Sequence, residues 1–180
     1  MNSKELFVRD TTVIRKSDNL FTAEVSENWS IGNTANGGYS MTLAAKAMSE
    51  YLEHKDPLSI SAHYLDRVDF GSTELHVTHL SSSKSLSTAR VEFIQDNKIK
   101  IIFIGTFTDF SFKNDLNIYE RDVPNFPEYN SCEVIPYKEG FNPKLDKNIE
   151  KAYAQDSLWW KKDIDNSSST LNLYMSWPEK

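Results

Sequence analysis

The sequence predicts an α+β fold in which a curled antiparallel sheet wraps around one long central helix. Only one segment, residues 38–53, carries a strong helical stripe of apolar residues. Two short extended segments precede it and four strand-like segments follow it, most of them with alternating apolar and polar residues. A single sheet that curves around the helix can cover its apolar face with this order of elements.

Before the helix, residues 12–14 and 20–25 are expected to form strands, joined by the turn-prone sequence Ser17-Asp18-Asn19. A polar loop, residues 26–36, follows these strands. Gly37 and Gly38 close the loop and open the helix.

The predicted helix has apolar residues at spacings of three and four positions. These residues are Met41, Ala44, Ala45, Met48, Tyr51 and Leu52. The small side chains of the alanines allow a sheet to approach the helix closely. The helix is expected to end before Pro57, because proline cannot continue a helix.

Four strands are expected after the helix. Residues 58–64, 75–78 and 89–93 alternate between apolar and polar side chains, whereas residues 99–110 are more continuously apolar, as in a strand buried on both faces. Asp96-Asn97 predicts a hairpin turn, since both residue types tolerate the left-handed backbone that such turns need. We expect the four strands to follow one another as a meander.

Composition and charge exclude several classes of protein. With 20 Lys and Arg against 26 Asp and Glu, the net charge is -6, so neither a nucleic-acid nor a membrane partner is expected. The single cysteine, Cys132, excludes an internal disulfide. The longest apolar run, Ile101 to Ile104, is too short to span a bilayer, and the amino-terminal residues carry no apolar signal segment. A cytoplasmic protein is expected.

A metal site is not expected either. His76 and His79 are three residues apart in a predicted strand, so their side chains point to opposite faces. His54 and His63 have no partner at a spacing typical of metal ligands.

The order of certain residues resembles the hotdog fold, and more closely the thioesterase-like family related to bacterial acyl-CoA thioesterase II. The resemblance covers residues 20–110. The residues that carry it are Trp29, Asn36-Gly37-Gly38-Tyr39, Ala44 to Ala47, Leu58-Ser59-Ile60, His63-Tyr64-Leu65, Val68, Gly71, Ser85 to Val91, Gln95 and Thr106-Phe107.

Members of that family usually carry two hotdogs in one chain. The resemblance therefore implies a hotdog domain over residues 1–112, a linker-like segment over 113–145, and the start of a second, truncated hotdog over 146–180. Leu171 to Trp177 alternates as an amphipathic strand without an obvious partner. Pairing of this strand across a homodimer is the alternative.

The family resemblance gives the start of the helix a catalytic interpretation. Free N–H groups at a helix start are good donors to a developing oxyanion. We expect the N–H groups of Gly38 or Tyr39 to be these donors, with Asn36 positioning the substrate and Gly37 allowing close approach. The alternative is that the two glycines form only a tight turn before the helix.

Other residues are expected to hold the substrate. Trp29 lines the acyl pocket together with Tyr39 and Met41, or else anchors the loop in the core. Arg90, with Lys84 and Lys98, would meet the phosphates of coenzyme A, unless these bases are only solvated. No cofactor is expected, since coenzyme A is part of the substrate. One residue of the pair Trp159-Trp160 is expected to pack on the hotdog or on the missing half.

The acid that activates water is not evident in the sequence. Some single-hotdog thioesterases place an aspartate on the helix, where this chain has Leu43, Ala44 and Ala45. In two-hotdog relatives the carboxylate comes from the second unit. The remaining acids, Glu50, Glu53, Asp66 and Asp69, are more typical of surface charges.

The sequence thus predicts an acyl-CoA thioesterase-like protein that hydrolyses or binds acyl thioesters and forms homo-oligomers through hotdog pairing. One alternative is a non-catalytic module that binds acyl chains or only dimerises. A second is a hotdog hydratase or dehydratase, in which His63 would need an aspartate partner.

Overall fold

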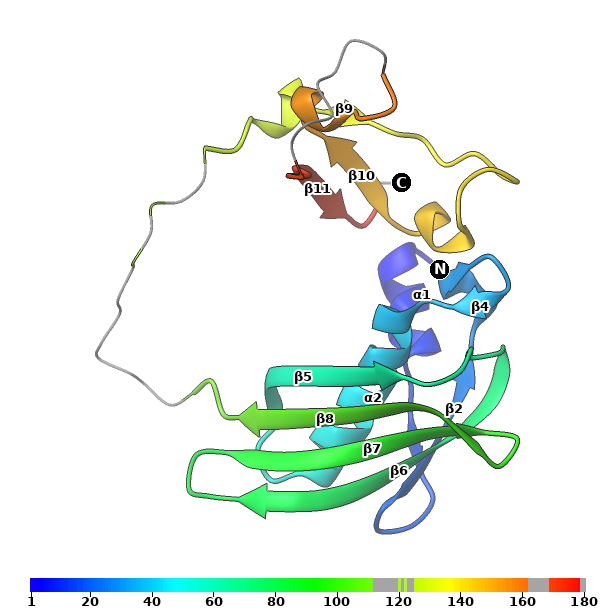
Figure 1. Cartoon of the computed structure of the whole chain (residues 1–180), viewed down its shortest axis with the longest axis vertical. Helices are drawn as coiled ribbons and strands as arrows, with labels where there is room; N and C mark the ends of the chain where they lie inside the picture. The colour runs from blue at the N-terminus through cyan, green and yellow to red at the C-terminus, as the bar shows by residue number, and fades with distance from the viewer. Residues whose placement is uncertain (112–119, 121, 123–124, 162–168, 179–180) are drawn as a thin grey trace.

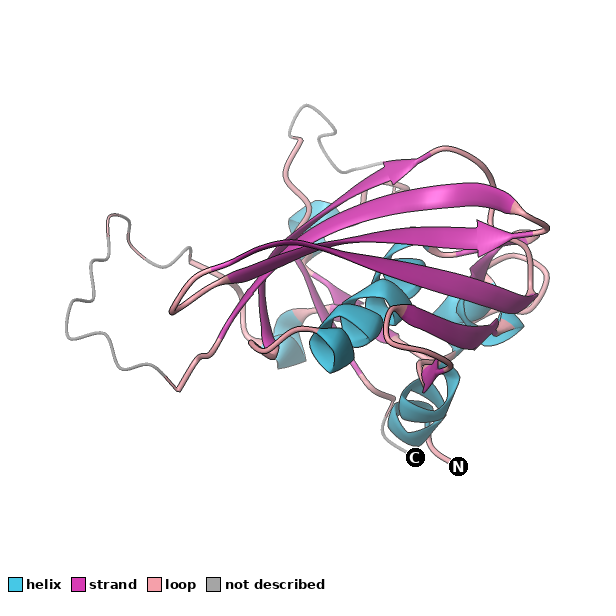
Figure 2. Ribbon diagram, turned by 90° about the horizontal axis from the view of Figure 1, so that it is seen from below, coloured by secondary structure: helices cyan, strands magenta, loops and turns pink. Residues whose placement is uncertain are grey.

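The computed structural model describes residues 1–111, 120, 122, 125–161 and 169–178. A six-stranded antiparallel sheet curls around helix α2 (Gly37–Tyr51), as Figures 1 and 2 show. The strand order is β1-β2-β6-β7-β8-β5. These strands are β1 (Ile14–Arg15), β2 (Leu20–Val25), β5 (Asp56–Tyr64), β6 (Gly71–Ser82), β7 (Ser87–Gln95) and β8 (Lys98–Thr108). The predicted α+β hotdog fold is confirmed.

The strands after the helix are connected differently from the predicted meander. The hairpins β6–β7 and β7–β8 are present, and Asp96 and Asn97 have φ of 50° and 58° in the second turn. Strand β5, however, pairs with β8 at the sheet edge, not with its successor β6. The other side of β6 is taken by β2, so β5 has no free edge there. The meander prediction is therefore wrong for this strand.

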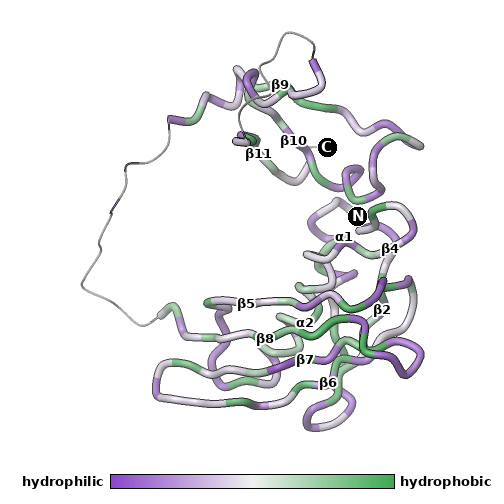
Figure 3. Tube along the Cα trace, viewed as in Figure 1, coloured by the Kyte–Doolittle hydropathy of each residue, from purple (hydrophilic) through white to green (hydrophobic). Residues whose placement is uncertain are grey.

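The core lies between α2 and the concave face of the sheet. The α2 side chains of Leu43, Ala44, Ala47 and Met48 are fully buried there. Strand β8 (green over much of its length in Figure 3) buries Ile101, Phe103 and Phe107 on this face, while Ile104 on the other face is 37% exposed. The prediction that β8 is buried on both faces is therefore wrong, because the described part of the chain leaves the convex side at Ile104 partly open to solvent.

Gly105 allows the helix to lie close to the sheet. A Cβ at this position would be 2.5 Å from the Met48 sulfur, 3.1 Å from Phe107 and 3.4 Å from Ile60. The contact between α2 and β8 therefore depends on the missing side chain.

The first ten residues contain a helix that the sequence analysis did not predict. Helix α1 (Ser3–Asp10) begins with a capping box, in which the Asn2 side chain accepts from the Glu5 N–H at 2.8 Å and Glu5 accepts from the Asn2 N–H at 2.9 Å. The predicted polar loop holds a 3₁₀ turn, η1 (Glu27–Trp29), and the short hairpin of β3 (Ser30–Ile31) and β4 (Thr34–Ala35).

The carboxyl-terminal segment forms a smaller antiparallel sheet in the order β11-β10-β9. Its strands are β9 (Glu133–Val134), β10 (Glu150–Tyr153) and β11 (Leu173–Ser176), with 3₁₀ turns η2 (Tyr129–Ser131), η3 (Lys144–Lys147) and η4 (Gln155–Ser157). Strand β11 pairs with β10, so the expectation that it lacks a partner is wrong. The predicted boundary at residues 112 and 113 lies outside the described residues.

This segment lies beside α1 and β4 in Figure 1 and contacts the hotdog through η3. Lys144 forms an ion pair with Glu27, and the Asn148 side chain donates to the Asn28 carbonyl at 3.1 Å. Trp160 packs edge-on against Tyr153 of β10. Trp177, which lies outside the predicted pair, packs on the hotdog against Phe7 and Trp29.

Candidate functional site

The start of helix α2 presents two unused backbone donors. Asn36 is the N-cap: its side-chain oxygen accepts from the Tyr39 N–H at 3.1 Å, and its carbonyl accepts from the Ser40 N–H at 3.0 Å. Within the described residues, the N–H groups of Gly37 and Gly38 have no acceptor. Of the two expected donors, Gly38 is thus free to meet a ligand, whereas Tyr39 is engaged by its own cap.

The side chain of Tyr39 is an anchor rather than a ligand. It is 3% exposed, its hydroxyl donates to the Asp10 carbonyl at 2.7 Å, and it accepts from the Ser26 N–H at 3.1 Å. Burial raises the pKa of Tyr39 to about 12, so the phenol stays a neutral donor. These bonds fix the helix start against α1 and η1.

Trp29, whose ring lies beside that of Tyr39, is held in place by Asp10. The Asp10 carboxylate accepts from the Trp29 indole N–H at 3.1 Å and from the Asn28 side chain at 2.8 Å, and it pairs with Arg9 at 2.7 Å. Burial alone raises the pKa of Asp10, but the hydrogen bonds from Asn28, Arg9, Ser26 and Trp29 outweigh it, and the pKa lies below its ordinary value of 3.8. The carboxylate is therefore a charged structural acceptor.

Four of the predicted site residues line one pocket of about 270 Å³: Trp29, Asn36, Gly38 and Tyr39. The remaining lining residues are Phe7, Thr42, Leu145, Ile149 and Trp177. The walls are mainly aromatic and aliphatic, and the free Gly38 N–H lies at the helix start that forms one side. Such a pocket suits an apolar chain that carries a carbonyl at one end.

The structure places the other predicted site residues elsewhere. A Cβ at Gly37 would lie 2.8 to 2.9 Å from the phenol of Tyr64, so this glycine lies against the end of β5. Met41 is half-buried and packs on the core outside the pocket. Arg90 alternates with buried residues of β7, which puts it on the convex face, where it pairs with Glu92. Arg90 is therefore remote from the pocket.

The acids named from the sequence do not line this pocket either. Asp66 accepts from Lys100 at 3.1 Å, and this bond holds the pKa of Asp66 below its usual range. Asp69 pairs with Arg67 at 3.1 Å. Glu50 and Glu53 are exposed at the far end of α2. In the part of the chain that the structure describes, these acids act as surface charges.

Sequence reasoning missed two parts of the site. Asp10 was overlooked because α1 was not predicted, although the Asn2-x-x-Glu5 capping box was a readable signal. The sequence pattern predicts a strand that includes Trp177, but the contacts of Trp177 are with Phe7 and Trp29, far away in the sequence. No local pattern could reveal them.

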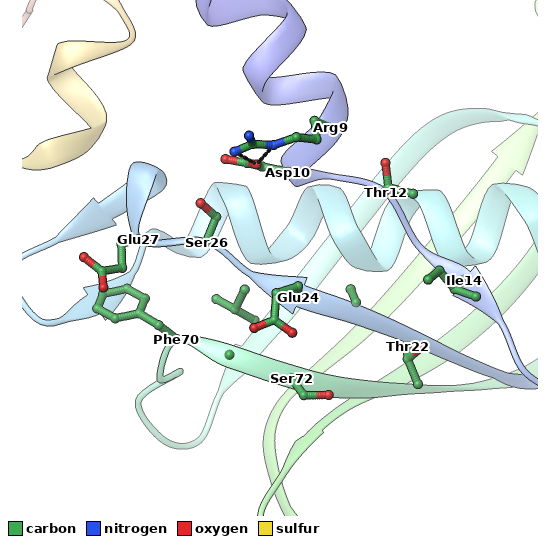
Figure 4. Close-up of a pocket in the computed structure, with 13 residues that line it drawn as sticks. Arg9, Asp10, Thr12, Ile14, Thr22, Glu24, Ser26, Glu27, Phe70 and Ser72 are labelled. Atoms are coloured by element: carbon green, nitrogen blue, oxygen red, sulfur yellow. Dashed lines mark hydrogen bonds and ion pairs between the residues drawn. The ribbon is translucent and has the colours of Figure 1, made fainter. Parts of the chain in front are cut away.

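A larger groove of about 630 Å³ lies between the end of α1, β2 and the start of β6 (Figure 4). Arg9, Glu24 and Glu27 line it, and Figure 4 shows Arg9 bound to Asp10 at its upper side. None of the predicted site residues lines this groove.

Two features are absent from the described residues. No group of three or more His, Cys, Asp or Glu side chains there could hold a metal ion. None of the described helices has the length and apolar character needed to cross a membrane.

Comparison with known proteins gives one family match. Residues 25–108 match the family described as acyl-CoA thioesterase N-terminal domain. No curated protein matches the chain.

Solved structures share the fold. A candidate thioesterase II from Thermobifida fusca has a TM-score of 0.77 and 20% identity, over 87% of this chain and 58% of that one. A hotdog protein of unknown function from Alicyclobacillus acidocaldarius has a TM-score of 0.73 and 12% identity, over 83% and 55%. The tesB protein of Mycobacterium avium subspecies paratuberculosis has a TM-score of 0.63 and 17% identity, over 83% and 59%.

The alignments with these three structures thus extend over little more than half of each of those chains. At these identities the likeness establishes the hotdog fold. Together with the family match, it confirms the resemblance to acyl-CoA thioesterase II-type proteins that the sequence indicated.

Proposed function

Because residues 25–108 form a thioesterase II-like hotdog domain, we propose that the protein binds acyl-CoA thioesters at the start of α2. The acyl chain enters the apolar pocket, and the thioester oxygen accepts from the Gly38 N–H. The observation that carries this proposal is the free Gly38 N–H on the wall of a pocket otherwise lined by Trp29 and its neighbours.

The physical chemistry of the helix start supports this assignment. The first N–H groups of a helix have no partner within it, and the helix dipole adds positive potential there. Gly38 carries no side chain to keep a thioester away from its backbone. The Asn36 cap uses the Tyr39 N–H, so the remaining donors are oriented by the helix itself.

Hydrolysis requires a base in addition to these donors. No carboxylate belongs to the pocket lining of the described residues. We therefore propose that the acid comes from a second hotdog, either in a longer form of the protein or in a second copy of the chain. On this proposal, β10 and β11 are the opening strands of a further hotdog unit.

The edge of the large sheet supports hotdog pairing. Strand β5 has one neighbour, β8, and its other edge is unpaired within the described chain. Leu58 and Tyr64 on this strand are 57% and 55% exposed. An exposed strand with apolar side chains is a template for another strand. Sedimentation velocity should therefore detect a dimer or larger assembly, and a monomer at all concentrations would contradict pairing.

The test of the proposed function is the release of free thiol from a panel of acyl-CoAs, together with calorimetric measurement of their binding. Gly38→Pro removes the donor at a first-turn position where proline is tolerated. Gly38→Ala is the matched control, since it keeps the N–H and its Cβ would meet only the Asn36 side-chain oxygen at 3.1 Å.

Loss of an oxyanion donor lowers turnover by about 10²- to 10³-fold. We expect this loss for Gly38→Pro and near-normal turnover for Gly38→Ala. Equal activity of a folded Gly38→Pro variant would refute the role of this donor.

A second candidate function is a non-catalytic acyl-binding or dimerising module. The lack of a carboxylate among the described lining residues favours it for this chain. Acyl-CoA binding without thiol release would identify that role. The hydratase alternative has less support, because His63 is exposed on β5 and does not line the pocket.

A further inference from the structure

Trp177, directly after β11, contacts the aromatic wall of the pocket. Its ring centroid lies 5.5 Å from that of Phe7 and 6.2 Å from that of Trp29, at an interplanar angle of 84° to the latter. These partners belong to α1 and η1, so the carboxyl-terminal segment itself supplies one side of the pocket. Trp177 is 39% exposed.

The position of Trp177 is fixed by further contacts of its segment. The Asn148 side chain donates to the Asn28 carbonyl, and Lys144 pairs with Glu27. Ile149, next to Asn148, packs against the hydrophobic core and also lines the pocket. The wall is therefore held by both polar and apolar contacts, and Trp177 does not depend on one ring contact.

A second hollow adjoins this wall at Ile149 and Trp177. It has a volume of about 400 Å³, and its lining among the described residues is Ile149, Met175, Ser176 and Trp177. Ile149 and Trp177 line both spaces, so the 270 Å³ pocket and the 400 Å³ hollow adjoin at these two side chains. Met175, 58% exposed, offers an apolar surface in the second hollow.

We propose that Trp177 determines the length of the acyl chain that the pocket accepts. This inference rests on the proposed function. An acyl chain whose carbonyl lies at the Gly38 N–H runs along Trp29 and ends at the indole of Trp177. A smaller residue at position 177 joins the two spaces and lets a longer chain continue toward Met175.

The test is calorimetric binding of straight-chain acyl-CoAs, from butanoyl to palmitoyl, to the full chain. Each additional buried methylene strengthens binding about fourfold. Affinity for the unmodified protein should therefore rise with chain length and then stop rising at a limiting length. Trp177→Ala should continue to gain affinity for several carbons beyond that length.

Trp160→Ala is the matched control. Trp160 is also a partly exposed tryptophan of the carboxyl-terminal segment, but its ring contacts are with Tyr153 and Trp159, away from the pocket. This variant should keep the limiting length of the unmodified protein. Trp177→Leu keeps an apolar contact with Phe7 and provides the same test if the alanine variant does not fold.

The outcomes separate the two proposals. If the unmodified protein shows a limiting length and the folded position-177 variants show the same one, the role of Trp177 is refuted and the proposed function stands. If the unmodified protein binds no acyl-CoA of any length, the proposed function is refuted and the role of Trp177 with it. A limiting length that shifts only with Trp177 supports both.

Discussion

The close packing of α2 on the sheet can be tested by adding one methyl group at Gly105. In Gly105→Ala, the new Cβ would be 2.5 Å from the Met48 sulfur, whereas a relaxed contact needs about 3.5–4.0 Å. Met48 is fully buried and cannot move into solvent. The helix or the Met48 side chain must therefore shift by about 1 Å.

The expected cost follows from this overlap. Overpacking a well-filled core costs about 1–3 kcal/mol. Replacing glycine recovers about 0.4–1 kcal/mol by restricting the unfolded chain. We therefore expect Gly105→Ala to lower the free energy of unfolding by about 1–2 kcal/mol, and the melting temperature by about 2–8 °C for a chain of this size.

The assay is a double-mutant cycle measured by urea unfolding, with tryptophan fluorescence and circular dichroism as probes. Met48→Ala alone should cost about 2–5 kcal/mol, because it leaves a cavity. In the double variant, the Gly105→Ala methyl group occupies part of that cavity. The double variant should therefore lose about 1–2 kcal/mol less stability than the sum of the losses in the two single variants. Strict additivity would refute the contact between Gly105 and Met48.

Three further predictions concern buried polar groups. Asp10→Ala removes the acceptor of the buried Trp29 indole N–H and should cost about 1–3 kcal/mol in unfolding experiments. Because the folded pKa of Asp10 lies below 3.8, its contribution to stability is present above pH ~4 and is lost as pH falls through the folded pKa. Acidification should therefore destabilise the Asp10→Ala variant less than the unmodified protein. The pKa of Tyr39 is raised from 10.0 to about 12, so its contribution to stability is complete below pH ~10 and is lost as pH rises through 12. Spectrophotometric titration should find one tyrosine that ionises at higher pH than the others, and this tyrosine should be missing in Tyr39→Phe. Ser87→Ala leaves the ring nitrogen of buried His54, 2.6 Å from the Ser87 hydroxyl, without that partner, and thermal melting should show a loss of about 1–3 kcal/mol.

Much of the fold could be predicted because its signals are local. The helix predicted from the stripe Met41 to Leu52 and the Asp96-Asn97 turn each lie within a short window of sequence, and both elements were confirmed. The buried face of the helix differs from the predicted stripe, since Leu43 and Ala47 are fully buried and Met41 is only partly so. The resemblance built on Asn36 to Tyr39 also identified a helix start with a free donor at Gly38.

The remaining features depend on contacts between distant residues. Strand β5 pairs with β8 because β2 occupies the edge of β6. This arrangement depends on several strands together and cannot be predicted from the sequence of β5 alone. Helix α1 is only eight residues long, and apart from its capping box it has no long apolar stripe of the kind that predicted α2. The engagement of the Tyr39 N–H is the exception, because it is local: an asparagine at a helix N-cap accepts from the second or third N–H of the helix, so the sequence carried this signal.

The pocket wall joins residues that are made at very different times during synthesis. Phe7 emerges from the ribosome early and Trp177 late, while Gly38 and the sheet that supports it lie between them. The hotdog can form its helix start before the last wall exists, because contacts over long sequence separations form slowly. A nascent chain therefore leaves the aromatic rings of Phe7 and Trp29 uncovered on this side until Trp177 packs against them.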